Sequence, residues 1–220
     1  MFSWLTDGQA GLGIEESANK ITAPYQHLAL QLNHEQRRTD DSRALLLVSP
    51  DQSVKQAAEA VLEITSSLAK VLCSPVLLID LCIEHSVLAN MLSVSPGRGL
   101  REKLQDQSIS LGETVLGTSD PNIYFLPAGL DRSQFSNGIN NKHDVVNIGP
   151  LLKETKERYA YTVLFGGSIL NDPISLAVAP HVGRVLLTVV ENKTSIADLK
   201  ASHKSFQLSR VKNVAHILLR

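Results

Sequence analysis

Short hydrophobic runs alternate with longer amphipathic stretches along most of the chain. The runs lie at 44–49, 76–80, 122–126, 161–165, 184–190 and 213–219. Between the first two runs, hydrophobic residues recur at the three- and four-residue spacing of a helix, at Val54, Ala57, Ala58, Val61, Ile64, Leu68 and Val71. Residues 147–158 and 194–208 also read as helices. The pattern therefore predicts strands that alternate with helices.

The hydrophobic runs lack the polar alternation of a strand with one face in water, which is typical of a sheet buried on both faces. Strands that alternate with helices favour right-handed crossovers and parallel pairing. We therefore predict an α/β fold with a doubly wound, mostly parallel sheet flanked by helices. A helical pattern at 15–36 and a polar linker precede it. We assign 1–42 to an N-terminal helical segment and linker, and 43–220 to the α/β domain.

Composition narrows the classes of function. The 220 residues carry 21 Lys and Arg against 22 Asp and Glu, a net charge of −1, whereas binding of nucleic acid needs a basic patch or stripe. Two cysteines, Cys73 and Cys82, are too few for a disulfide framework, and we interpret both as core thiols. No stretch reaches the ~20 apolar residues of a membrane span, and the N-terminus lacks the features of a signal peptide. We expect a cytoplasmic protein.

The turn after the first predicted strand is where a sheet of this kind binds phosphate. It reads SPDQSVKQ (49–56), whereas a P-loop reads G-x-x-x-x-G-K-[ST]. If Lys55 is the P-loop lysine, Ser49 and Val54 replace the two glycines and Gln56 replaces the Ser or Thr. Only the lysine is retained. The start of the next helix could still attract an anion loosely through its dipole.

Five later segments follow one another in a recognisable order. They are VLLID (76–80), GRGLREKL (97–104), IYFLPAGL (123–130), YAYTVLFGGS (159–168) and DPISLAVAPHVGRVLLTVVENKT (172–194). Their order and spacing resemble the bacterial exopolysaccharide tyrosine kinases (BY-kinases), which belong to the ParA/MinD-like P-loop ATPases. The resemblance runs from about residue 44 to the end of the chain, and it implies a P-loop NTPase-like fold.

The same resemblance implies that the nucleotide site has lost most of its ligands. Asp80 matches the first aspartate of the family's D-x-D-x-R element, but Cys82 and Glu84 occupy the second aspartate and the arginine. Phe165 stands where the Walker B aspartate belongs, and residues 166–168 (GGS) replace a T-P-P sequence.

Each replacement removes a specific contribution to nucleotide binding. Val54 is β-branched and disfavours the positive φ that a P-loop glycine can adopt. Gln56 has no hydroxyl for Mg²⁺, and Phe165 offers none of the oxygen ligands that Mg²⁺ requires. We therefore expect no catalytic residue, no metal and no cofactor, and we interpret Lys55 and Asp80 as a vestigial nucleotide site. Weak binding of ATP and Mg²⁺ is the alternative.

Other candidate elements of the family or of a metal site are incomplete. None of the four tyrosines lies in the last fifty residues, where kinases of the family carry a phosphorylated cluster. The stretch 23–32 keeps Tyr25 and Leu28 of a helical element used by the family in ring formation. It lacks the charged residues of that element, so we interpret it as an ordinary amphipathic helix. Cys82 and His85 have a C-x2-H spacing, but no fourth ligand for zinc is evident.

These observations predict a non-catalytic BY-kinase-like protein that acts as a scaffold or regulator in bacterial exopolysaccharide or capsule synthesis and export. The resemblance implies an inner-membrane polysaccharide co-polymerase, or a true kinase of the same system, as partner. It also implies a peripheral position at the inner membrane through that partner. One alternative is an active but divergent ATP-dependent protein-tyrosine kinase or ATPase. Another is a ParA/MinD-type positioning protein, although the chain shows no C-terminal basic amphipathic helix.

Overall fold

A single mixed sheet organises the chain. The computed structural model describes residues 24–34, 43–82, 87–94, 97–129, 148–211 and 213–219. The seven strands are β1 (Ala44–Ser49), β2 (Val76–Asp80), β3 (Leu116–Gly117), β4 (Ile123–Leu126), β5 (Tyr161–Ser168), β6 (Arg184–Val190) and β7 (Val214–Leu219). Their order across the sheet is β3-β4-β2-β5-β1-β6-β7. Every pair is parallel except β3 with β4, which confirms the predicted fold class.

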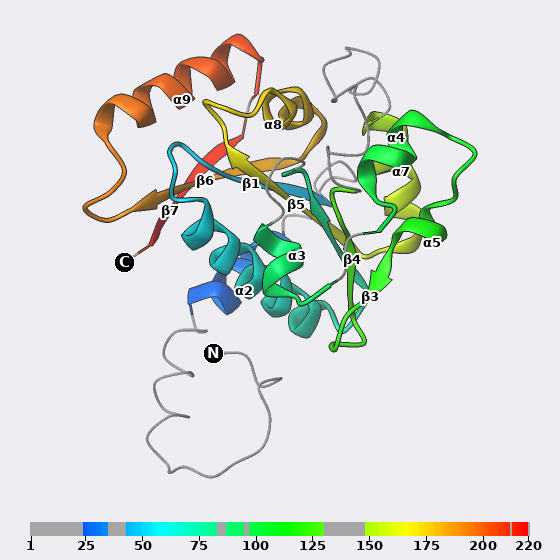
Figure 1. Cartoon of the computed structure of the whole chain (residues 1–220). Coiled ribbons are helices and arrows are strands. Elements are labelled where there is room, and N and C mark those ends of the chain that lie inside the picture. The colour runs from blue at the N-terminus through cyan, green and yellow to red at the C-terminus, as the bar shows by residue number, and fades with distance from the viewer. Residues whose placement is uncertain are drawn as a thin grey trace, which may run out of the picture.

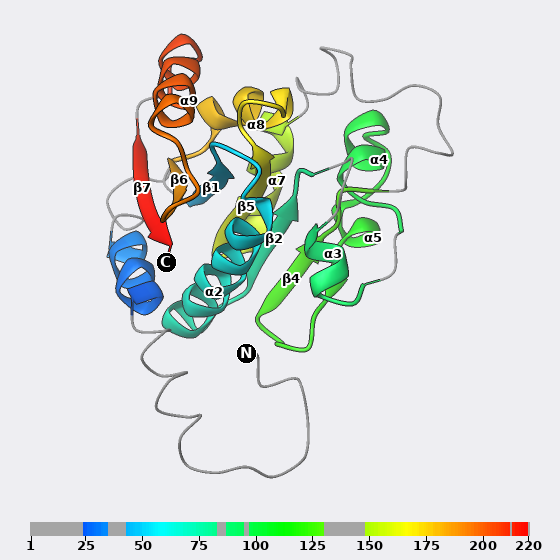
Figure 2. The same ribbon diagram turned by 60° about the vertical axis from the view of Figure 1, so that its left-hand side comes forward.

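Helices cover both faces of the sheet (Figures 1 and 2). One face carries α2 (Val54–Leu72), α3 (Val87–Met91) and an N-terminal helix at residues 24–34. The other carries α4 (Leu100–Gln105), α5 (Leu111–Thr114), α7 (Ile148–Arg158), α8 (Pro173–Val178) with the 3-10 turn η3 (Ala179–His181), and α9 (Ile196–Leu208). Two hydrophobic clusters, one on each face, therefore form the core.

The local sequence accounts for the central elements. All residues of β1, β2 and β5 are buried, as expected for strands covered on both faces. The long helix α2 buries one side along its length, including Ala57, Val61, Ile64 and Leu68, so the predicted helical spacing is confirmed. The residue after its last turn, Cys73, caps the helix in a left-handed conformation with φ 46°. Cys73 is exposed, so its interpretation as a core thiol was wrong.

The N-terminal helix is part of the packed core. Ala29 and Leu32 are buried in the cluster that also holds α2, and Tyr25 and Leu28 pack against it. Burial raises the pKa of the Tyr25 hydroxyl, and negative charge on Glu63, together with that on Glu59, raises it further. The predicted helix is therefore present over 24–34 and packs on α2. None of the helices in the described part of the chain combines the length and hydrophobicity that crossing a bilayer requires.

Candidate functional site

Three neighbouring strands bring the residues of the predicted site to one end of the sheet. Strand β5 lies between β2 and β1. The register pairs Phe165 with Asp80 of β2 and with Leu47 of β1, and the loop after Ser49 leads from β1 into α2. The parallel topology therefore places the degenerate loop, Asp80 and Phe165 at the same end of neighbouring strands. Doubly wound sheets bind their ligands at this end, beyond the carboxyl ends of the strands.

The loop between β1 and α2 hydrogen-bonds to a carboxylate of its own. The Ser53 amide donates to Asp51 Oδ1 at 2.7 Å, and the Ser49 hydroxyl donates to the same oxygen at 3.1 Å. In a P-loop, backbone amides at this position point toward the phosphates. Here the Asp51 carboxylate accepts a hydrogen bond from one of those amides, that of Ser53.

The Asp51 carboxyl group is held in its ionised form. Burial by itself would raise its pKa, but hydrogen bonds from the Ser53 amide and from hydroxyls that include Ser49 outweigh that effect, so the pKa lies below its ordinary value. The loop therefore carries a full negative charge at neutral pH. A phosphate that approached it would meet a like charge where a P-loop offers only donors.

The first turn of α2 lacks the geometry of a P-loop. Val54 begins the helix and packs against the core. The described non-glycine residues with positive φ are Cys73, Ser93, Asn192 and Arg210. The loop thus contains no left-handed residue, consistent with the β-branched side chain at the second glycine position. The side chain of Lys55 is exposed to solvent on the helix surface. The one retained P-loop residue is therefore in the right segment of the chain but is not buried within a site.

Asp80 lies fully buried at the end of β2. Its Oδ1 accepts a hydrogen bond of 2.9 Å from the Cys82 amide. Burial raises the pKa of the Cys82 thiol well above its ordinary value, and the negative charges of Asp80 and Asp172 add to that rise. Cys82 is thus a neutral thiol among carboxylates. The position of Glu84 and that of His85 lie outside the described residues, within which no group of three metal-binding side chains occurs.

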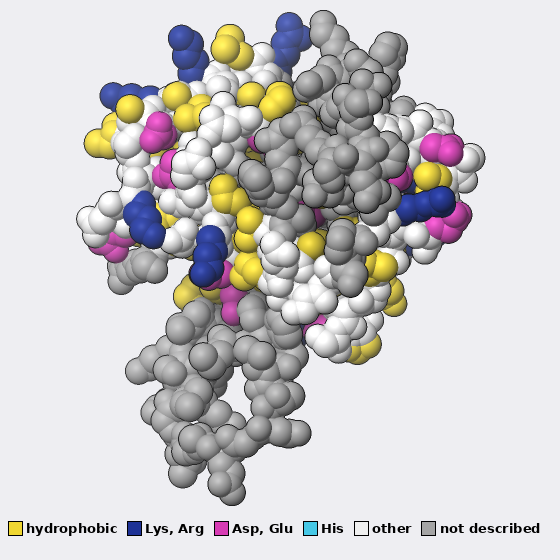
Figure 3. All heavy atoms as spheres, viewed as in Figure 1, with side chains coloured by type: hydrophobic (Ala, Val, Ile, Leu, Met, Phe, Trp, Pro, Cys, Tyr) yellow, Lys and Arg dark blue, Asp and Glu magenta, His cyan; other side chains and the backbone are white. Residues whose placement is uncertain are grey.

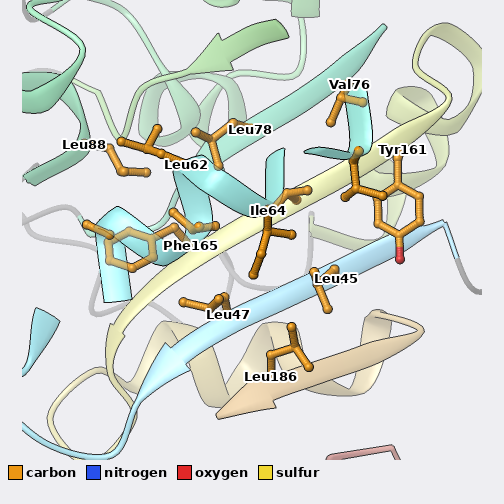
Figure 4. Packing of buried hydrophobic residues seen from close by; sticks show 14 of the residues in the cluster. Leu45, Leu47, Leu62, Ile64, Val76, Leu78, Leu88, Tyr161, Phe165 and Leu186 are labelled. Atoms are coloured by element: carbon orange, nitrogen blue, oxygen red, sulfur yellow. The ribbon is translucent and has the colours of Figure 1, made fainter. Parts of the chain in front are cut away.

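Phe165 fills space on the α2 face of the sheet. Its side chain is fully buried and belongs to the cluster that contains Leu47, Leu62 and Leu88. Figure 4 shows the ring in the cluster with these residues. An aromatic ring here contributes hydrophobic burial, whereas a Walker B carboxylate would need a metal or a hydrogen-bond donor beside it.

The end of β5 is closed on the opposite face by α8. A Cβ atom added at Gly166 would overlap the Ser175 hydroxyl and would lie 2.9 Å from Val48 Cγ1. Ser175 is itself buried and donates to Asp172 Oδ2 at 3.0 Å, and Asp172 also caps α8 by accepting from the Ile174 amide.

We therefore expect Gly166→Ala to lower the free energy of unfolding by about 1–3 kcal/mol, the usual cost of overpacking a core. Urea unfolding measures the change. Gly117→Ala is the matched control, because an added Cβ there meets nothing within 4 Å. An equal and small effect of both substitutions would show that α8 does not pack tightly on β5.

Sequence reasoning missed two residues of this region, Asp51 and Asp172. Both are acidic and both cap backbone amides two residues further along the chain. Asp51 lies in the sequence Ser-Pro-Asp-Gln-Ser, and a carboxylate two residues before an amide at a helix start is a recognisable capping signal. Asp172 stands immediately before Pro173, the favoured residue in the first helical turn. These local signals mark the caps, but they do not show that the charges of Asp172 and Asp80 both act on Cys82.

No protein family model matches the sequence, and no curated protein matches it significantly. Solved structures do match. The BceF tyrosine kinase domain superposes with a TM-score of 0.73 at 17% identity, covering 90% of this chain and 76% of that one. The kinase domain of the Escherichia coli tyrosine kinase ETK gives 0.73 at 18%, covering 90% and 74%. The VpsO kinase domain gives 0.68 at 20%, covering 95% and 100%.

ATPases of the wider group match as well. A ParA family ATPase from Chlorobium tepidum superposes with a TM-score of 0.65 at 14% identity, covering 82% of this chain and 74% of that one. Structural similarity at such low sequence identity establishes the fold. The chemistry of the site has to be inferred from its own residues. The chain therefore has the P-loop NTPase-like fold that bacterial tyrosine-kinase domains share with ParA and MinD ATPases.

Proposed function

We propose that this chain is a non-catalytic relative of the BY-kinase domains that acts as a scaffold or regulator in bacterial exopolysaccharide or capsule synthesis and export. The observation that carries the proposal is the Asp51 carboxylate, which accepts the Ser53 amide within the loop that would hold phosphate. A buried ring at Phe165 supports it, because that position supplies no ligand for Mg²⁺.

The proposed partner is an inner-membrane polysaccharide co-polymerase or a true kinase of the same system, through which the chain would lie at the cytoplasmic face of the membrane. The resemblance of the sequence to BY-kinases motivates this partner. A scaffold needs surface for such contacts, and α9 exposes hydrophobic side chains at both ends: Ile196 is 71% exposed and Leu208 is 77% exposed. Figure 3 shows hydrophobic atoms at the surface in the region of this helix, at the upper left of the view.

A divergent ATP-dependent kinase or ATPase is the second candidate. Asp80 favours it, because this buried carboxylate lies at the end of β2, at the position that matches a metal ligand of the family, with only β5 between it and β1. The candidate requires Lys55 to turn from solvent toward the loop and Asp51 to leave it. The similarity to ParA and MinD ATPases keeps a positioning role as a third candidate.

Calorimetric titration with ATP and with ADP, each with Mg²⁺, tests the proposal. We expect no binding heat at millimolar nucleotide, and no ATP hydrolysis above that of the Lys55→Ala variant. Micromolar, Mg²⁺-dependent binding that Lys55→Ala or Asp80→Asn abolishes would overturn the non-catalytic assignment. An active kinase domain of the same fold, titrated under identical conditions, establishes that the assay detects binding.

A further inference from the structure

Two histidines meet on the side of the sheet opposite α2. His203 lies on α9 and His216 lies on the edge strand β7. Their Nε2 atoms are 2.8 Å apart, and their ring centroids are 4.9 Å apart with the planes tilted by 46°. The two rings therefore point their Nε2 atoms toward each other across the gap between helix and strand.

This pair is not needed to hold α9 in place. Phe206 and Ser202 of the same helix are buried against the sheet, whereas His216 is exposed and His203 is partly exposed. A hydrogen bond between exposed neutral rings contributes little to stability. His216 pairs with Leu187 of β6, which pairs with Val48 of β1, so the histidine pair lies two strands away from the end of β1. Its residues are distinct from those of the degenerate site.

The chemistry of the pair favours metal ions that bind imidazole. Neutral imidazole nitrogen is a preferred ligand of Zn²⁺, Cu²⁺ and Ni²⁺ and a poor one for Mg²⁺.

The geometry requires only a small adjustment. Two nitrogens bound to one tetrahedral zinc at 2.0–2.1 Å lie about 3.3 Å apart, so the pair must open by about half an ångström and each ring must turn toward the ion. Exposed side chains change rotamer readily. The protein supplies two ligands, because no third His, Cys, Asp or Glu among the described residues forms a metal-binding group with them. Water molecules would complete the coordination.

We propose that His203 and His216 form a two-imidazole site for a divalent transition-metal ion of the zinc class, which would tie α9 to the edge strand β7. The ion replaces the hydrogen bond between the rings, and the ring that donates its Nε2 proton carries it on Nδ1 instead. Bound metal would stabilise the packing of α9 against β7.

Titration of the full chain with ZnCl₂, followed by calorimetry and by NMR of the imidazole nitrogens, tests the site. We expect the Nε2 resonances of both His203 and His216 to shift together on addition of Zn²⁺ but not of Mg²⁺. His203→Ala and His216→Ala should each weaken Zn²⁺ binding at least about tenfold, since even outer-shell partners of a metal site contribute that much. Zn²⁺ should also raise the unfolding temperature of the unmodified chain more than that of either variant.

His27→Ala is the matched control, because His27 is an exposed histidine on the N-terminal helix and its loss should leave Zn²⁺ binding at the pair unchanged. Both alanine variants are expected to fold, since neither ring is buried, and circular dichroism checks this. Zn²⁺ binding that survives both substitutions would overturn the proposal. The proposal would also be overturned if Zn²⁺ left the Nε2 resonances of His203 and His216 unshifted, because a hydrogen bond alone would then join the pair.

Discussion

Replacing Phe165 by alanine is expected to lower the free energy of unfolding by about 3–5 kcal/mol, the range for truncation of a buried aromatic residue. The ring is fully buried. Because β5 lies between β2 and β1 in the middle of the sheet, the neighbouring strands cannot move in to fill the cavity that the substitution leaves. The change removes an aromatic side chain from the cluster that also holds Leu47, Leu62 and Leu88. Urea unfolding at equilibrium measures it.

Leu208→Ala on α9 is the control for this substitution, because Leu208 is 77% exposed and its truncation should change stability by less than about 0.5 kcal/mol. A loss below about 1 kcal/mol for Phe165→Ala would contradict the assignment of Phe165 to the core. Phe165→Asp should destabilise the fold further, because it buries a second carboxylate beside Asp80.

Replacing Asp51 by asparagine is expected to raise the affinity of the loop for phosphate groups at least about fivefold. Two like charges about 4 Å apart repel by about 1 kcal/mol in water and about 4 kcal/mol at the effective dielectric of a protein surface. Asparagine keeps an oxygen that can accept from the Ser53 amide but carries no charge. Calorimetry with tripolyphosphate measures the change, in a Val54→Gly and Gln56→Thr background that restores the second P-loop glycine and the hydroxyl residue after the lysine.

Asp106→Asn in the same background is the matched control. Asp106 also accepts hydrogen bonds from an amide and a hydroxyl two residues further on, both from Ser108, but it lies at the C-terminus of α4. Its substitution should leave the affinity for tripolyphosphate unchanged. If Asp51→Asn and Asp106→Asn behave alike, the Asp51 charge does not close the loop to anions, and the non-catalytic proposal must rest on Phe165 alone.

Much of the fold was predictable because its signals are local. The bounds of β1, β2 and β6 match the predicted hydrophobic runs, and α2 matches the predicted helical spacing. The predictions missed the short elements α3, α4, α5 and α8 and the antiparallel strand β3. Segments of two to six residues show too little periodicity to identify, and packing against the sheet determines their conformation.

The sequence by itself determined that this protein builds a buried parallel sheet and that its phosphate loop lacks both glycines. Those properties follow from residue type and spacing along the chain. Only the tertiary structure decided that Asp51 occupies the loop, that Phe165 packs under α2, that Lys55 points into solvent, and that His203 meets His216. Each of these depends on the direction of a side chain or on contact between strands and helices that are distant in sequence. Strand register and packing determine both, and the periodicity of the sequence does not encode them.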